Sequence, residues 1–333
     1  MKRLSGPVAA AVVALAFGAL LVLAAESFAS AYLVTLMAVL FLNAALAVSL
    51  TVSNGLTGIF SLGHPAFMTI GAYVAAILTF PASRKGMLSD LPEMMSQIEF
   101  GLLPAALVAG LVGAGLALLI GLLVLRLRGH YLAVATLGLI VIVQSLATNL
   151  DGWTRGGSGL SGVPRLSGVW WAFGFLVLAI VAGWRLKFSS YGRAMLATRE
   201  NELAAECVGI RTFRVRLIAF TFGAVFAALA GALMVHLIGV VTPKSYSIIL
   251  AFNLVVMVVI GGQGSIVGAF VAAAAITAFS EALRPVEESV GLYGLSQVIV
   301  ALALILMLYL RPQGLFGSGE PGLVRTMFEG RRA

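Results

Sequence analysis

Glu202 and Glu206 lie four residues apart in the one long polar segment of an otherwise apolar chain, residues 185–216. Asn201 can cap the start of a helix there and Gly209 can supply the left-handed residue that ends it, so the spacing predicts a helix of about two turns. The two carboxylates share one face of this helix and repel each other. A small apolar patch is adjacent: Leu203, Ala204 and Cys207. Paired acids beside an apolar patch suit docking to another protein; a solvated helix resting on lipid headgroups is the alternative.

The residue types that perform catalysis or bind cofactors are not arranged for either task. The histidines His64, His130 and His236 are scattered and form no His-Glu-x-x-His motif, which disfavours a metalloprotease. The chain has no Gly-x-x-x-x-Gly-Lys-Ser/Thr string, so we do not expect it to hydrolyse ATP as P-loop proteins do. Cys207 is the single cysteine, which excludes an intrachain disulfide and a thiolate zinc cluster. We therefore expect no catalytic residues and no metal or cofactor bound by this chain.

Two glycine-rich stretches interrupt apolar runs, at residues 54–66 (NGLTGIFSLGHPA) and 261–269 (GGQGSIVGA). Glycine lets helices break and approach one another closely, and nearby polar side chains can satisfy the backbone groups that a break frees: Ser61, Gln263 and Ser265. Broken helices at membrane depth usually line a path. The two stretches share a weak Gly-x-x-Ser-apolar-x-Gly pattern, which is compatible with an internal repeat.

His64 lies in the first of these stretches and is the strongest single candidate for a functional residue. An ionisable side chain in an apolar run is a functional-site hypothesis, because its charged form is costly there. The alternative is a neutral histidine that donates to a backbone carbonyl freed by Pro65. Ser61, Gly63 and His64 are therefore the first candidates for lining a pathway through the membrane.

A further set of polar residues follows on the apolar run at 130–150. Thr136, Gln144 and Asn149 fall at about helical spacing, so a shared face is possible but imperfect. Such residues either line a cavity or hold a helix to its neighbours. We include Thr136 and Asn149 among the pathway candidates.

Composition decides the fold class. The chain has 333 residues, of which 61% are hydrophobic and 10% are charged, too few polar side chains to cover soluble domains. Apolar runs recur at about 7–25, 31–52, 56–80, 102–125, 130–150, 169–184, 217–240, 248–260, 265–280 and 292–310. They predict an all-α, polytopic transmembrane helical bundle with broken helices, one domain over residues 1–333 with about 8–10 spans. The runs 248–260 and 265–280 are too short to cross a bilayer without tilt or a break.

Basic residues indicate the orientation in the membrane. Fifteen of the 21 lysines and arginines fall near the termini, at 126–128 or in 185–216, and six fall in loops on the other side. Both termini and the segment 185–216 are therefore expected in the cytoplasm, and the loop 151–168 outside. The net charge of +8 reports this topology rather than nucleic-acid binding. The run 7–25 imitates a signal peptide but exceeds a usual core of ~7–15 residues, so we expect a retained first helix.

Several motifs resemble one family, the branched-chain amino acid ABC transporter permeases, and specifically their LivM-like branch. The string GRAMLATRENELAAECVGI (192–210) is similar to the loop that meets the ATPase, with Ala204, Ala205 and Gly209 matching its Ala-Ala-x-x-x-Gly core. Leu203 stands where the general motif has glutamate, as in this branch, and the motif's Leu-Pro ending is absent. Three more stretches are similar to the family: SLGHPAF (61–67), in which Pro65 replaces a glycine, residues 126–165, and LYLRPQGLFG (308–317).

The resemblance implies a permease subunit of an ATP-driven ABC importer for branched-chain or related amino acids, working by alternating access in the bacterial inner membrane. The implied partners are a second permease subunit, cytoplasmic P-loop ATPases that use the ATP, an extracytoplasmic solute-binding protein and membrane lipid. The implied contacts to the ATPase involve Arg199, Glu202, Ala204, Ala205, Glu206 and Gly209. Permeases for urea or another small amide look similar. An autonomous secondary transporter or channel is the alternative class, although few carboxylates are placed to bind ions at the midplane.

Overall fold

The structure is a computed structural model that describes residues 6–86, 88, 92, 97–127, 129–291, 294–317 and 319–320, with main chain only for residues 6–15. Six basic residues used in the orientation argument lie outside the described residues: Lys2, Arg3, Arg128, Arg325, Arg331 and Arg332.

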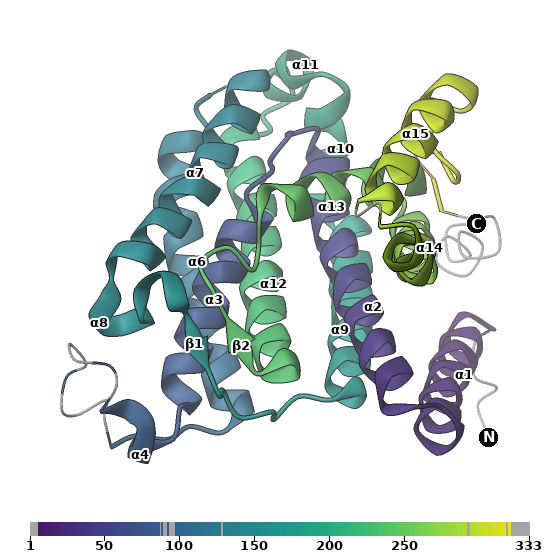
Figure 1. Cartoon of the computed structure of the whole chain (residues 1–333). Coiled ribbons are helices and arrows are strands. Elements are labelled where there is room, and N and C mark those ends of the chain that lie inside the picture. The colour runs from purple at the N-terminus through teal and green to yellow at the C-terminus, as the bar shows by residue number, and fades with distance from the viewer. Residues whose placement is uncertain are drawn as a thin grey trace, which may run out of the picture.

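Apolar helices make up the molecule, which confirms the predicted all-α polytopic bundle (Figure 1). Within the described residues, six helical segments are long and apolar enough to cross a bilayer: α2 (Ala31–Leu50) continued by the π-helix η1 (Thr51–Gly55), α6 (Leu102–Val124), α7 (His130–Asn149), α9 (Val169–Lys187), α12 (Thr212–Ile238) and α14 (Ile266–Val290). Four more apolar helices are α1 (Gly6–Phe28), α3 (His64–Thr79), α13 (Ile248–Gly261) and α15 (Leu295–Leu310).

Two of the predicted helix ranges are wrong. The run at 265–280 was expected to be too short, but α14 continues to Val290 and has 25 residues, because polar residues from Glu281 onward end the apolar run without ending the helix. The run at 56–80 was expected to be one helix, but α3 begins only at His64 and the residues before it form the first break. The short run at 248–260 is confirmed as the 14-residue α13.

Helix α12 is central and packs against α3, α6 and α2. Its small residues allow very close contacts: a Cβ atom on Gly231 would lie 2.1 Å from the carbonyl oxygen of Met68 in α3, and one on Gly71 in α3 would lie 2.1 Å from that of Ala228. The small residues of α12 therefore allow tight helix packing.

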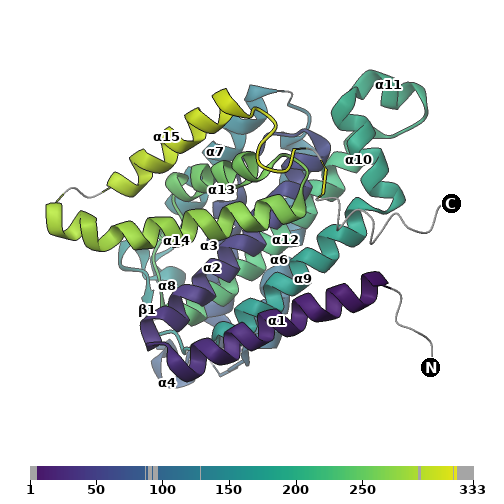
Figure 2. The ribbon, with the colours of Figure 1, turned by 90° about the vertical axis from the view of Figure 1, so that its right-hand side faces the viewer.

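The two ends of the bundle carry different short elements. One end, which we call the α11 end, holds α10 (Ser190–Glu200) and α11 (Glu202–Cys207); Figure 2 shows the start of α1 on this side as well. The opposite end holds α4 (Ala82–Lys85), α8 (Asp151–Thr154), the 3₁₀ turn η2 (Gly156–Ser158) and the strands β1 (Leu160–Ser161) and β2 (Val240–Val241). The two strands pair antiparallel, with Leu160 opposite Val241.

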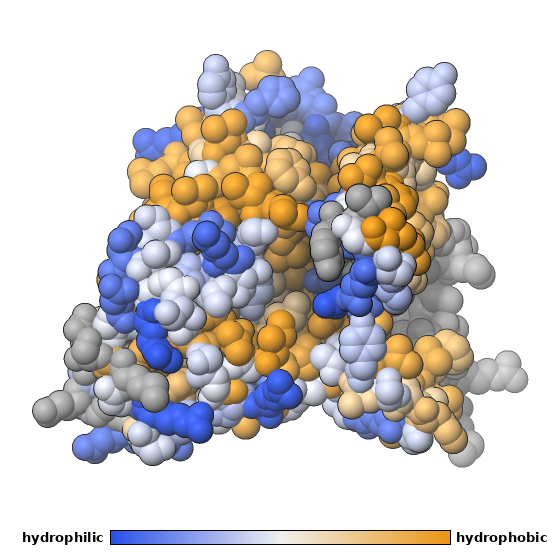
Figure 3. Space-filling view, viewed as in Figure 1, coloured by the Kyte–Doolittle hydropathy of each residue, from blue (hydrophilic) through white to orange (hydrophobic). Residues whose placement is uncertain are grey.

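The surface matches this arrangement. Figure 3 shows apolar side chains over α7 and α15 and polar side chains gathered around α11. Exposed leucines also run along α6: Leu103, Leu107, Leu111, Leu118, Leu119, Leu122 and Leu123. An apolar surface of this extent suits contact with lipid or with another membrane subunit.

Candidate functional site

The short helix α11 forms as the sequence predicts. The Asn201 side chain accepts a hydrogen bond from the Ala204 backbone N–H at 3.0 Å, and Gly209 adopts a φ of +85° just after the helix ends. The backbone N–H of Ile210 donates to the carbonyl of Ala205 at 3.0 Å, which closes the C-terminal turn. Ala205 is buried, so it holds α11 against the bundle rather than facing outward.

The two glutamates of α11 are already partnered within the chain. The Glu202 carboxylate forms an ion pair with Arg216 at 2.8 Å, and Glu206 accepts a hydrogen bond from the Thr212 hydroxyl at 2.7 Å. Both partners belong to α12, so the acids anchor α11 to that helix. Glu206 is nevertheless exposed and Glu202 is partly exposed, so the predicted docking role of the two acids stays a prediction.

The outward surface of α11 is apolar. Leu203 is 70% exposed and Val208 is 76% exposed, and the single cysteine Cys207 is exposed beside them. Large apolar side chains at these levels of exposure, on a helix whose charged groups are internally paired, suit contact with a second protein surface. The exposed apolar face of α11 is made by Leu203, Cys207 and Val208, with Ala204 at its edge.

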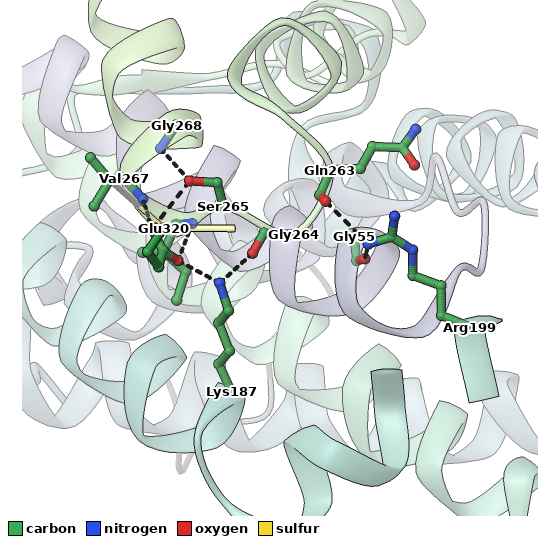
Figure 4. Close-up of polar contacts among 10 residues, drawn as sticks. Gly55, Lys187, Arg199, Gln263, Gly264, Ser265, Val267, Gly268 and Glu320 are labelled. Carbon is green, nitrogen blue, oxygen red and sulfur yellow. Dashed lines mark hydrogen bonds and ion pairs between the residues drawn. The ribbon is translucent and has the colours of Figure 1, made fainter. Parts of the chain in front are cut away.

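Arg199 connects the end of α10 to both glycine-rich breaks. Its Nη1 atom donates to the carbonyl oxygen of Gly55 at 2.8 Å and to that of Gln263 at 3.1 Å (Figure 4). Gly58 lies beneath the same side chain: a Cβ atom there would be 3.1 Å from Arg199 Cγ. Arg199 lies two residues before the cap of α11, so one guanidinium group joins the chain beside α11 to both breaks.

The two breaks also touch each other directly. A Cβ atom on Gly55 would lie 2.8 Å from the backbone nitrogen of Gly264. Gly262 and Gly264 both have positive φ values, of 109° and 100°, which only glycine adopts readily. The glycines thus bring α2 and the α13–α14 turn into backbone contact.

Four of the pathway candidates come together at the first break. Thr136 Oγ1 on α7 accepts a hydrogen bond from the Leu62 backbone N–H at 2.9 Å, and Ser61 Oγ accepts one from Gly63 at 3.4 Å. His64 begins α3, and its Nε2 atom lies 3.3 Å from Ser49 Oγ. All are buried, so in this conformation they hold the break together rather than line an open channel.

Asn149 does not join this cluster. It is exposed at the far end of α7 and donates to the Ser145 carbonyl at 2.8 Å, whereas Gln144 donates to the Tyr246 carbonyl at 3.2 Å.

A pocket of about 130 Å³ lies between the first break and α13. Its lining includes Asn54, Gly58, Phe60, Val258 and Gln263.

Comparison with known proteins identifies the family. Residues 32–309 match the family described as the branched-chain amino acid transport system / permease component. The chain belongs to this family. The permease is 31% identical over 312 residues to the high-affinity branched-chain amino acid transport system permease protein LivM of Salmonella typhimurium and to that of Escherichia coli, a match covering 84% of this chain and 68% of each LivM.

More distant members act on a different compound. The permease is 31% identical over 215 residues to the autoinducer 2 import system permease protein LsrC of Yersinia pseudotuberculosis, which covers 60% of this chain and 59% of LsrC. No solved structure matches the permease. Family membership makes it a multi-pass membrane transport subunit.

Sequence reasoning missed several groups of this site in the permease. The Gly55 and Gln263 carbonyls carry no sequence signal, since every residue has a carbonyl group. Lys187 was counted only as part of a basic segment, yet its side chain is buried and its Nζ atom donates to the Gly264 carbonyl at 2.6 Å. The one signal in the sequence was a lysine close to the end of a predicted membrane helix.

Proposed function

We propose that this permease is the membrane-spanning subunit of an ATP-driven importer of branched-chain or related amino acids in the bacterial inner membrane. The family match and the two LivM relatives support the solute class. The observation that carries the mechanism is the bridge from α10 through Arg199 to Gly55 and Gln263.

The α11 end faces the cytoplasm in this proposal. Basic residues are concentrated there: Arg185, Lys187, Arg193, Arg199, Arg211, Arg214, Arg216 and Arg311. Cytoplasmic loops carry such an excess in membrane proteins. The segment 151–168, with α8 and β1, then lies outside, where it is available to an extracytoplasmic solute-binding protein.

ATP is bound and hydrolysed by separate cytoplasmic subunits, and this chain binds no cofactor of its own. The apolar face of Leu203, Cys207 and Val208 is the surface that docks into the ATPase. A second permease subunit completes the membrane part, and the exposed apolar faces of α7 and α15 are available for it or for lipid. These partners follow from the family and from the surfaces on this chain.

Transport follows from movement at the breaks. When the ATPases close, they displace α11, and Arg199 pulls on the carbonyls of both breaks at once. The pocket between the first break and α13 then opens or closes, so solute reaches one side of the membrane at a time. Ser61, Gly63, His64 and Thr136 form the hinge beside this pocket, and Asn149 lies toward the outer entrance.

Reconstitution tests the proposal. The permease is placed in liposomes with its ATPase, its second permease and its binding protein, and uptake of labelled leucine is measured with and without internal ATP. We expect uptake only with ATP and with all partners present. Uptake by the permease alone, without nucleotide, would establish a secondary transporter, and uptake of urea in place of leucine would assign the small-amide class.

A further inference from the structure

The chain segment after α15 is fastened onto the second break. The backbone N–H of Leu315 donates to the Ile260 carbonyl at 2.8 Å, and that of Phe316 donates to the Gly261 carbonyl at 3.3 Å. A Cβ atom on Gly262 would lie 2.5 Å from the carbonyl oxygen of Gly317. Residues 311–317, together with 319 and 320, are called the strap, and its residues 314–317 lie in backbone contact with the end of α13.

The strap ends in a buried carboxylate. The Glu320 side chain is 1% exposed and forms an ion pair with Lys187 Nζ at 2.6 Å (Figure 4). Its two oxygens also accept hydrogen bonds from the Ile266 N–H at 2.9 Å, the Ser265 hydroxyl at 3.1 Å and the Val267 N–H at 3.3 Å. Apart from Lys187, the groups that donate to this carboxylate all lie at the start of α14.

The position of Glu320 is electrostatically favourable for two reasons. The first N–H groups of α14 have no partners within the helix, and the N-terminus of this 25-residue helix attracts negative charge. The Lys187 ammonium neutralises the carboxylate, and Lys187 itself is only 8% exposed. Each charge therefore needs the other, since a buried charge without a partner is costly.

A buried ion pair fixes the relative positions of the elements it joins more than it stabilises the fold. Two apolar side chains of similar size would pack at least as favourably, because both charges lose their hydration on burial. An ion pair differs from an apolar contact in what happens when it opens: both charges regain water, so the open state is not strongly disfavoured. Lys187 with Glu320 thus has the physical properties of a contact that can close and open.

Lys187 is the last residue of α9 and Arg199 lies near the end of α10, and the two side chains reach adjacent residues of the same break. Lys187 donates to the Gly264 carbonyl at 2.6 Å, and Arg199 donates to the Gln263 carbonyl at 3.1 Å. Arg199 also binds the first break, whereas Lys187 binds the strap and, through Glu320, the start of α14. The end of α9 and the end of α10 thus connect to different parts of the bundle.

We propose that Glu320 and Lys187 are positioning residues of the second break, and that the strap makes α14 follow the movement of α9 and α10 during transport. This inference rests on the proposed function, because it assigns a role within the transport cycle. Without the ion pair, α10 still moves the Gln263 carbonyl through Arg199, but the start of α14 is free to stay behind.

Three variants separate positioning from simple stability. Glu320→Gln keeps the size and an acceptor oxygen but leaves the Lys187 ammonium unpaired, and Lys187→Met leaves the carboxylate unpaired. The double variant removes both charges and therefore leaves neither unpaired. Glu288→Gln is the matched control, because Glu288 lies on α14 in an exposed ion pair with Arg284. The measured quantities are leucine uptake per ATP hydrolysed in the reconstituted complex and thermal stability in detergent.

We expect both single variants to lower thermal stability and the double variant to restore most of it. Uptake per ATP should fall about fivefold in all three, within the range by which residues between two sites change their coupling. Glu288→Gln should match the original chain. If the double variant recovers uptake per ATP together with thermal stability, the pair has only a structural role and the proposal is overturned. Unchanged uptake per ATP in Glu320→Gln would also overturn it.

A measurement on the unmodified complex covers the case in which the variants fail to assemble. Hydrogen–deuterium exchange is compared with and without ATP, and we expect residues 260–268 and 311–317 to change together. If exchange changes at 260–268 while it stays constant at 311–317, the proposed role of the strap is overturned. Absence of ATP-dependent uptake by the unmodified complex would instead contradict the proposed function itself.

Discussion

Arg199 Nη1 lies 2.8 Å from the carbonyl oxygen of Gly55, a residue 144 positions earlier in the chain. The same nitrogen lies 3.1 Å from the Gln263 carbonyl oxygen. One side chain therefore holds the two interrupted helices at the point where the chain leaves the bundle for α11. This geometry joins the segment beside α11 directly to both glycine-rich breaks.

Removing the guanidinium should uncouple transport. In Arg199→Met, both carbonyls lose a charge-assisted hydrogen bond of about 1.5–3 kcal/mol, so we expect ATP-driven uptake to fall about tenfold or more while the ATPase still binds. Arg199→Lys should rescue little, because the lysine side chain is one bond shorter and its ammonium does not reach the position that Nη1 occupies between the two carbonyls. Arg193→Met on the exposed face of α10 is the control. Equal uptake by Arg199→Met and Arg193→Met would show that the bridge is not needed.

Charging the outer face of α11 should prevent assembly. Leu203→Glu places a carboxylate where a 70% exposed leucine is free to enter a partner surface, and burial of that charge is costly. We expect the permease to insert normally but to lose co-purification with its ATPase. Val240→Glu, an exposed apolar position in β2 at the opposite end, should retain it. If Leu203→Glu binds the ATPase as tightly as Val240→Glu does, the docking face lies elsewhere.

The turn after α11 requires glycine for its backbone rather than for space. Gly209 has a φ of +85°, and no atom lies within 4 Å of a Cβ atom built there. Gly209→Val should therefore cost about 1–2 kcal/mol through backbone strain and weaken ATPase association without affecting insertion. Gly209→Asn should be milder, since asparagine tolerates this conformation. Co-purification of the valine variant at the original level would count against a role in docking.

The contact between α3 and α12 should be intolerant of larger residues. A Cβ atom on Gly71 would lie 2.1 Å from the backbone oxygen of Ala228, which cannot move aside as a flexible side chain can. Gly71→Val should lower stability by about 1–3 kcal/mol or more, seen as a lower midpoint of thermal unfolding in detergent. The same substitution at Gly174 on α9, where a Cβ atom meets nothing within 4 Å, should have a much smaller effect. Similar midpoints for the two variants would contradict the close packing.

Local patterns predicted much of this site, because their causes are local. The cap at Asn201 and the left-handed Gly209 depend only on neighbouring residues, and both ends of α11 appear where these residues predict them. The glycine-rich breaks were also visible, because several glycines lie close together with polar residues inside otherwise apolar runs. The partners of Glu202 and Glu206 were not visible, because Arg216 and Thr212 face them only after α12 has turned back beside α11.

The length of α14 shows a second limit of prediction from the sequence, because apolar runs do not mark where a helix ends. Its last turns contain Glu281, Arg284, Glu287 and Glu288, so a search for apolar runs ended ten residues early. A helix can continue past the apolar core of a membrane, where polar side chains are hydrated. The strap was equally invisible, because the carboxylate of Glu320 meets Lys187 across 133 residues.

Labelling of Cys207 tests the central claim most directly. This cysteine is the single one in the chain and is exposed on α11, so no engineered residue is needed. A membrane-impermeant maleimide is added to spheroplasts and to inverted membrane vesicles, each with and without the ATPase bound. The account predicts labelling only in inverted vesicles and protection by the ATPase. Labelling of Cys207 in intact spheroplasts would place α11 outside the cell and contradict the account.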